Sequence, residues 1–147
     1  MSKTDNELQY IDDFYKKLKS ISKLRYKAMD GIDELNAEIL ELSKTEFIPD
    51  YIWSSIGLEF FHSDRFHLAE EAYKRAIESA NSLPEDEKNV LRQIYGDLSM
   101  VYEHDGKYVE ALDVAQKALK VSKEFYDETN DKVKEMQGKV NKLKKLV

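Results

Sequence analysis

Apolar and small residues recur in the middle of the chain with a period of 42 positions. Both copies carry them in the same order, and spacings of three and four residues within each copy are typical of helix faces. The first copy comprises Trp53, Ile56, Gly57, Phe60, Phe66, Ala69, Tyr73 and Ala76, and the second comprises Tyr95, Leu98, Ser99, Tyr102, Tyr108, Ala111, Ala115 and Ala118. A duplicated pair of helices predicts a solenoid-type interaction module and argues against an enzyme.

Turn signals predict where the helices of the two copies begin and end. Pro49 is tolerated at a helix start but not inside a helix, so a helix should run from there to His62. A second helix should follow over 65–81. In the second copy we expect helices over 85–104 and from Lys107 onwards, separated by the turn residues Asp105 and Gly106. These limits give a first repeat at 50–81 and a second at 85–124.

A heptad pattern precedes the repeats. Its apolar positions are Ile11, Phe14, Leu18, Ile21, Ala28, Ile32, Leu35, Ile39 and Leu42, with Arg25 in one slot. Thr4 and Glu7 form a capping-box signal for a helix start. Residues 4–45 should therefore form one long helix, or a hairpin that breaks near Ser20–Ser22 or at Asp30–Gly31. The lack of Gly or Pro near Ser20 slightly favours the long helix.

A second heptad pattern follows the repeats and predicts that the last helix continues without a break from Lys107 to Val147. Its seam is Leu112, Ala115, Leu119, Ser122, Tyr126, Thr129, Val133, Met136, Val140, Leu143 and Val147. Residues 125–147 would form a lysine-rich extension of that helix. Two long helices would project from opposite ends of a single domain, 1–147. Their seams could then be buried only between chains, which predicts a homodimer or higher oligomer.

The repeated positions resemble the tetratricopeptide repeat, whose pattern is W-x2-L-G-x2-Y followed by Ala, an aromatic residue and Ala. Residues 50–81 lack only the final proline, which Asn81 replaces. Residues 92–123 depart further, and the replacing residues are Tyr95, Ser99, Ala115 and Lys123. The period of 42 instead of 34 is similar to the longer repeat of kinesin light chains. The resemblance covers about half the chain and implies an all-α superhelix, here with long heptad helices at both ends.

The resemblance also implies a protein or peptide partner bound in a concave groove, with no cofactor. Groove positions carried over from the family are Tyr51, Ser54, Leu58, Phe61 and His62 in the first repeat, and Gln93, Gly96, Met100, Glu103 and His104 in the second. Leu58, Phe61 and Met100 form an apolar patch there, which would take an apolar anchor of a peptide or be covered by the N-terminal helix or a second copy of the chain.

One ligand of the family is disfavoured. Chaperone-binding members hold a C-terminal carboxylate with Lys and Asn, and the matching positions here are Ser54, Leu58 and Asp97. None of these side chains carries a positive charge, and Asp97 would repel a carboxylate. The aromatic residues of both repeats are expected to pack in the core instead of forming a cofactor site.

Composition and charge add limits of their own. The formal net charge is -6, which does not suit binding along a nucleic acid. The chain has no cysteine, residues 2–7 are polar, and no run approaches the ~18 apolar residues of a membrane span, so a cytoplasmic protein is expected. No catalytic motif is present, and His62 and His104 should lie about 10 Å apart, too far for one metal ion.

The lysine-rich end leaves three interpretations open. Lys132, Lys134, Lys139, Lys142, Lys144 and Lys145 are opposed by a single acid, Glu135. Cations stabilise the C-terminal end of a helix dipole, and a basic amphipathic helix also suits an anionic membrane surface. Nucleic-acid binding is the weakest interpretation, because this segment has no aromatic residue and no arginine. The predicted function is thus a protein-interaction module that also self-associates. The alternatives are a coiled-coil assembly subunit or a peripheral membrane protein.

Overall fold

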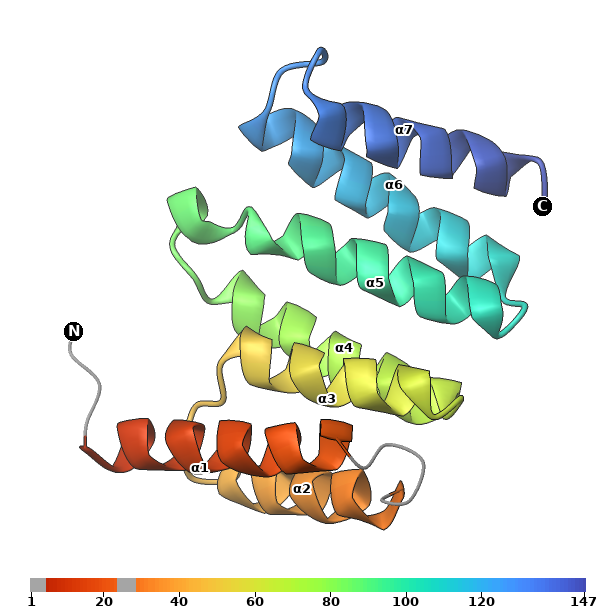
Figure 1. Cartoon of the computed structure of the whole chain (residues 1–147). Coiled ribbons are helices and arrows are strands. Elements are labelled where there is room, and N and C mark those ends of the chain that lie inside the picture. The colour runs from red at the N-terminus through yellow and green to blue at the C-terminus, as the bar shows by residue number, and fades with distance from the viewer. Residues whose placement is uncertain (1–4, 24–28) are drawn as a thin grey trace. The chain divides into compact units, whose positions relative to one another are not determined.

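The computed structural model describes residues 5–23 and 29–147. The chain forms two compact units, Met1–Ile48 and Pro49–Val147. Over the described residues every element is a helix, which confirms the predicted all-α class (Figure 1).

The first unit holds α1 (Asp5–Lys23) and α2 (Met29–Leu42), which pack against each other. A salt bridge of 2.8 Å joins Lys17 to Glu38 across the two helices. Apolar side chains at heptad positions of both helices are buried: Phe14, Ile32, Leu35 and Ile39. In this unit the heptad pattern marks the apolar faces of a helical pair.

The long N-terminal helix that the sequence slightly favoured is therefore wrong, and the hairpin alternative is the one found. Two helices that pair can shield apolar faces that a lone helix would leave in water. Both suggested break points, Ser20–Ser22 and Asp30–Gly31, lie inside helices. The predicted seam positions Arg25 and Ala28, and the predicted capping residue Thr4, lie outside the described residues.

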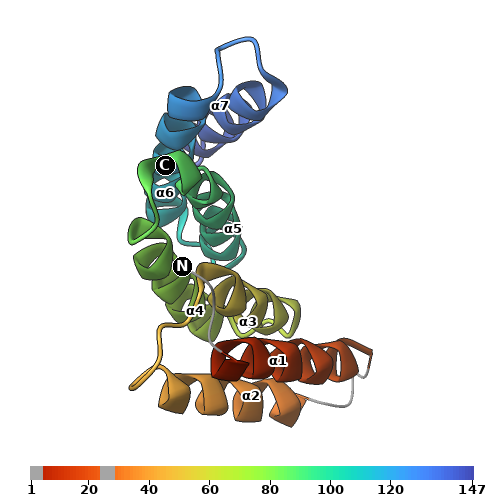
Figure 2. The ribbon, with the colours of Figure 1, turned by 90° about the vertical axis from the view of Figure 1, so that its left-hand side faces the viewer.

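The second unit contains five α-helices in which each helix packs mainly against the next. They are α3 (Asp50–His62), α4 (Phe66–Asn81), α5 (Val90–His104), α6 (Tyr108–Phe125) and α7 (Asp131–Lys144). In this unit α3, α5 and α7 lie on one side and α4 and α6 on the other (Figure 2). The predicted helices over 49–62 and 65–81 match α3 and α4 closely.

Small residues allow neighbouring helices of the repeats to pack closely. Ala69, Ala76, Ala111 and Ala118 are fully buried, and Trp53, Phe60, Tyr73 and Tyr102 fill the space around them. Three aromatic residues that were expected in the core lie outside it. Phe66 and Tyr95 are only half-buried, and Tyr108, which begins α6, is 38% exposed.

The turns after α3 and α5 are alike. Asp64 and Gly106, which are 42 residues apart, both adopt positive φ angles, of 59° and 76°. In both turns the next backbone N–H donates to a carbonyl five residues earlier, at 2.9 Å in the first and 2.8 Å in the second. This bond pattern is the Schellman motif, which ends a helix and reverses the chain.

The start of the second repeat differs from the prediction. A helix was expected from Glu85, but the chain makes a 3-10 turn, η1 (Glu85–Glu87), and α5 begins only at Val90. Residues 85–89 are all polar, so no apolar side chain in this stretch can anchor a helical turn to the core.

The predicted uninterrupted helix over 107–147 is also wrong, because α6 ends at Phe125 and α7 begins at Asp131. Side chains in the intervening turn bind nearby backbone groups. Asp127 accepts a hydrogen bond from the backbone N–H of Thr129 at 3.0 Å, and Asn130 accepts one from Lys132 at 2.9 Å. Such local bonds compete with helix continuation, and Asn130 caps the start of α7.

After this turn α7 packs back on α6 and continues the 42-residue period. Two series of buried side chains recur at that spacing: Ile52, Ile94 and Met136, and Ile56, Leu98 and Val140. Thus α7 is a third copy of the first helix of the repeat. Where α3 and α5 carry aromatic residues, it carries Gln137 and Lys144. Polar residues on an outer helix are typical of a solenoid cap.

Because α7 packs back on α6, the apolar seam of the C-terminal segment does not need a second chain to bury it. The apolar positions of α7, Val133, Met136, Val140 and Leu143, are buried within the chain. Self-association therefore stays a prediction without the seam argument that led to it.

Candidate partner-binding site

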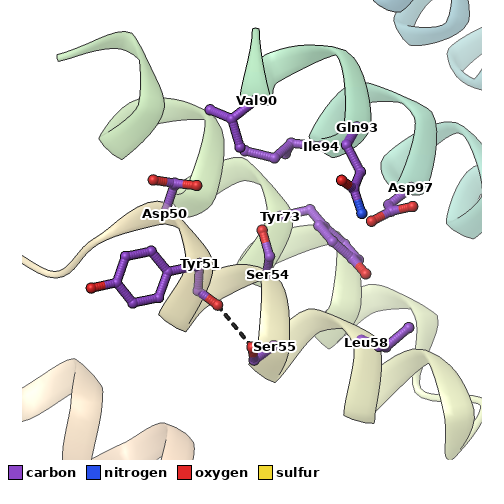
Figure 3. A pocket seen from close by; sticks show the side chains of 10 residues that line it. All are labelled: Asp50, Tyr51, Ser54, Ser55, Leu58, Tyr73, Val90, Gln93, Ile94 and Asp97. Carbon is purple, nitrogen blue, oxygen red and sulfur yellow. Dashed lines mark hydrogen bonds between the residues drawn. The ribbon is translucent and has the colours of Figure 1, made fainter. Parts of the chain in front are cut away.

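A pocket of about 250 Å³ lies between α3 and α5 on the second unit. Its lining comes mainly from these two helices, and one residue comes from α4: Asp50, Tyr51, Ser54, Ser55, Leu58, Tyr73, Val90, Gln93, Ile94 and Asp97 (Figure 3). Four of these were expected groove residues, Tyr51, Ser54, Leu58 and Gln93, and Asp97 was the position expected to repel a carboxylate. These five carried-over positions line one cavity, and its polar groups decide what it can bind.

Tyr73 reaches this pocket because residue 57 has no side chain. A Cβ atom built on Gly57 would lie 2.8 Å from Cε2 of the Tyr73 ring, closer than real Cβ atoms come. The ring therefore packs directly on the backbone of α3, and its polar end reaches the pocket. Figure 3 shows the ring between Ser54 and Asp97.

Two hydroxyl groups of the pocket lack hydrogen-bond partners. Tyr73 is fully buried, and its Oη has no partner among the described residues. The Oγ of Ser54 is buried and unpaired in the same sense. Ser55, in contrast, donates to the carbonyl of Tyr51 at 2.8 Å. Since buried polar groups are normally paired, two unpaired hydroxyls in one pocket indicate a place for a polar ligand or water.

Two carboxyl groups stand at opposite ends of the pocket, and Asp50 is buried whereas Asp97 is half-buried (Figure 3). Burial raises the pKa of Asp97, and the positive charge of Lys139 opposes that rise only in part. Burial also raises the pKa of Asp50, against a hydrogen bond from its own backbone. The pKa of the Tyr73 hydroxyl is raised by burial first and by the charge of Asp97 second. A positively charged group in the pocket would relieve this unfavourable burial of negative charge.

The remaining expected groove residues lie elsewhere. Phe61 and His104 form an edge-to-face contact, with ring centroids 5.0 Å apart, and Phe66 joins this aromatic cluster. His62 is exposed and its ring lies 5.7 Å from that of Phe61. Met100 is half-buried.

The helix α7 occupies the groove face of the second repeat. Lys139 donates to the carbonyl of Gly96 at 3.0 Å, and the methyl group of Met136 lies beside the same glycine. Lys142 pairs with Glu103 at 3.2 Å. Two positions carried over as partner-binding, Gly96 and Glu103, are thus engaged by the chain itself. The open part of the groove lies at the first repeat and its junction with α5.

The structure adds pocket residues that the sequence reasoning missed. Asp50, Ser55, Val90 and Ile94 lie one helical turn or less from expected positions, so a three- or four-residue spacing along each helix could have found them. Tyr73 was assigned to core packing. The signal for it was the pairing of Gly57 with an aromatic residue on the next helix.

Of the six lysines of the C-terminal segment, three bind within the chain. Besides Lys139 and Lys142, Lys132 contacts the hydroxyl of Tyr126 at 3.1 Å. Lys142 and Lys144 lie in the last turn of α7, where cations stabilise the helix dipole. Within the described ranges, every helix is too short or too polar to cross a bilayer. The side chains of those ranges include no cluster of three potential metal ligands.

Comparison with known proteins identifies the repeat. A family model described as tetratricopeptide repeat matches residues 51–124. The fold resembles the crystal structure of BtubC (BKLC) from P. vanneervenii, with a TM-score of 0.54 and 22% identity. The match covers 97% of this chain and 50% of that one, so the chain spans about half the length of its structural neighbour. No curated protein matches.

These findings confirm the family predicted from the 42-residue duplication. Tetratricopeptide repeats are protein-interaction modules that generally bind protein partners and typically act as scaffolds instead of enzymes. The match covers both helix pairs, α3–α4 and α5–α6. The chain belongs to the tetratricopeptide repeat family.

Proposed function

We propose that this protein is an adaptor that binds a segment of a protein partner across α3 and α5, with the pocket between them as the anchor point. The observation that carries the proposal is the pair of buried, unpaired hydroxyls in an open pocket, which belongs to Ser54 and Tyr73. A ligand that pairs these groups makes hydrogen bonds that the described residues of the chain do not supply.

The rim of the pocket supports the same function. Leu58 is 39% exposed and Tyr51 is 36% exposed, so both offer apolar surface beside the polar interior. A pocket with apolar walls and a few oriented polar groups is the usual form of a peptide side-chain subsite. With α7 against the second repeat, the partner segment would contact mainly the first repeat and the start of α5.

Selection of peptides from a displayed random library against the full chain tests this function. The binding of a selected peptide should be weakened in Leu58→Gln, because the pocket rim loses apolar surface without a change of charge. Val109→Gln is the matched control. Val109 is an apolar residue of α6 that is 68% exposed and does not line the pocket. Peptides that bind both variants and the original chain equally would contradict the proposal.

Amide chemical shifts locate the binding surface independently. Titration of the labelled chain with a selected peptide should move signals of α3 and of the first turns of α5. Shifts confined to other helices would place the partner surface elsewhere and overturn this assignment.

A further inference from the structure

We propose that the pocket selects a basic side chain, lysine or arginine, from the bound partner segment. This inference rests on the function proposed above and specifies its chemistry. Two carboxyl groups, those of Asp50 and Asp97, line the pocket, and none of the lining residues in the described part of the chain is cationic.

The negative charge of Asp97 is not neutralised by a close ion pair. Among residues 5–23 and 29–147, no cationic nitrogen lies within 4.0 Å of its carboxylate. The charge of Lys139 acts on Asp97, but its ammonium group donates to the carbonyl of Gly96. Lys139 therefore lowers the cost of the buried charge without saturating the carboxylate oxygens, which remain available as acceptors.

The unpaired hydroxyls extend the acceptor set. Figure 3 places the Tyr73 ring between Ser54 and Asp97, and all three residues line the same pocket. A lysine ammonium has three donor hydrogens and a guanidinium has five, and neither group can accept. Such a donor-only group matches a site made of a carboxylate and hydroxyl oxygens.

Other side chains fit this pocket less well. A carboxylate would be repelled by Asp97, and an apolar side chain would leave Asp97 and both hydroxyls without a partner. The walls formed by Leu58, Val90 and Ile94 suit the methylene stem of a lysine or arginine. Specificity would thus come from the penalty on wrong side chains as well as from the new bonds.

The arrangement has a second consequence for the free protein. A half-buried carboxylate without a close counter-ion destabilises the fold, and a binding site can retain such a group because the ligand needs it. Asp97→Asn should therefore raise or preserve the melting temperature while it weakens binding. If Asp97 served only to stabilise the fold, its replacement would lower the melting temperature instead of raising or preserving it.

The test uses the full chain and peptides selected from a random library. Selected peptides that shift the α3 and α5 signals should share a lysine or arginine, and replacement of that arginine by citrulline, or of that lysine by norleucine, should weaken binding at least about tenfold. Asp97→Asn should cause a similar loss. Asp113→Asn, which removes one charge from an exposed position of α6, should change the affinity less than about twofold.

The outcomes separate this inference from the proposed function. Peptides that bind in the pocket but share no basic residue, or that bind Asp97→Asn as well as the original chain, would overturn the basic-side-chain inference and leave the adaptor function standing. Peptides that never involve α3 and α5 would overturn both.

Discussion

The two repeats achieve the same close approach of neighbouring helices with different pairs of residues. In the first repeat Gly57 leaves room for the ring of Tyr73, and a Cβ atom at 57 would collide with it. In the second repeat Ser99 and Ala115 hold the equivalent positions. Ser99 is fully buried, and its hydroxyl donates to the carbonyl of Ala111 at 2.8 Å. The two positions are therefore coupled. A large side chain on the second helix of a repeat requires glycine on the first helix, whereas a small side chain on the second helix leaves room for a serine on the first.

This difference also decides where a pocket can form. The Gly57–Tyr73 pair brings an unpaired hydroxyl to the groove face of the first repeat. The Ser99–Ala115 pair satisfies its hydroxyl internally and sends no side chain to the groove. The first repeat, which keeps the consensus glycine and aromatic residue, thus builds the candidate site. The second repeat, which departs from the consensus at both positions, uses them only for packing.

The largest expected effect comes from Tyr73→Ala. Removal of a fully buried aromatic side chain leaves a cavity and should lower the free energy of unfolding by about 3–5 kcal/mol. Urea denaturation followed by circular dichroism measures it. Tyr73→Phe is the control, because it removes only an unpaired buried hydroxyl and should be neutral or stabilising. A large loss in Tyr73→Phe would show that the hydroxyl is paired in solution.

Gly57→Ala should destabilise the chain by about 1–2 kcal/mol, because overpacking against the Tyr73 ring outweighs the better helix propensity of alanine. Gly138→Ala is a matched control in α7. No atom lies within 4 Å of the Cβ position there, so alanine should stabilise by up to about 1 kcal/mol. Thermal and urea unfolding of both variants provide the comparison.

The coupling itself is tested by combining Gly57→Ala with Tyr73→Ala. Once the ring is gone, alanine at 57 should cost nothing, so the double variant should be no less stable than Tyr73→Ala alone. Strictly additive losses would mean that the two positions do not depend on each other, and the comparison between the repeats would fail.

A smaller effect is expected from Ser99→Ala. The change removes one buried hydrogen bond and should cost about 1 kcal/mol. Ser55→Ala removes a less buried serine bond of the same type and should cost less. Equal losses in urea unfolding would indicate that the bond to the carbonyl of Ala111 adds nothing specific to the second repeat.

The smallest effect concerns the junction between the repeats. Tyr102 of α5 donates to the carboxylate of Glu70 at 2.8 Å, and Lys74 pairs with the same group at 3.0 Å. Burial alone would raise the pKa of Glu70, but these two partners and Lys107 lower it below its ordinary value of 4.5. Leu112 stands at the equivalent position of the second repeat, so only the first repeat has this polar contact.

A lowered pKa means that the folded chain holds the ionised form of Glu70 more strongly than the unfolded chain does. The resulting stability is present above pH 4.5 and is lost as the pH falls through the lowered folded value. Glu70→Gln should remove about 0.5–1 kcal/mol at neutral pH and flatten this acid limb. Glu78→Gln, an exposed acid of the same helix, should leave the limb unchanged in unfolding measured at several pH values.

The sequence predicted the repeat helices because their apolar positions, small residues and turn signals agree locally. The break at 126–130 was missed, because Ser122, Tyr126 and Thr129 fit the heptad spacing although they are not apolar core residues. The helix ends there because the side chains of Asp127 and Asn130 form hydrogen bonds with nearby backbone groups, and the spacing of apolar residues does not predict such bonds.

Only part of the candidate site could be predicted from the sequence, because some of its residues depend on contacts between helices. Positions on α3 and α5 follow from helix spacing, whereas the reach of Tyr73 from α4 depends on the space that Gly57 leaves. The engagement of Gly96 and Glu103 by α7 could not be foreseen either, because it depends on the reversal at 126–130.

The constant spacing of Ile52, Ile94 and Met136 limits how a gene for such a protein can change in length. Removal or duplication of one whole period joins a helix to its own equivalent, so every buried position stays in phase. An insertion of a single residue within a helix would instead rotate all later side chains by about 100° and expose the core face. Lineages of this chain should therefore differ by steps of 42 residues or by changes in the turns, and its helices should tolerate substitution far better than insertion.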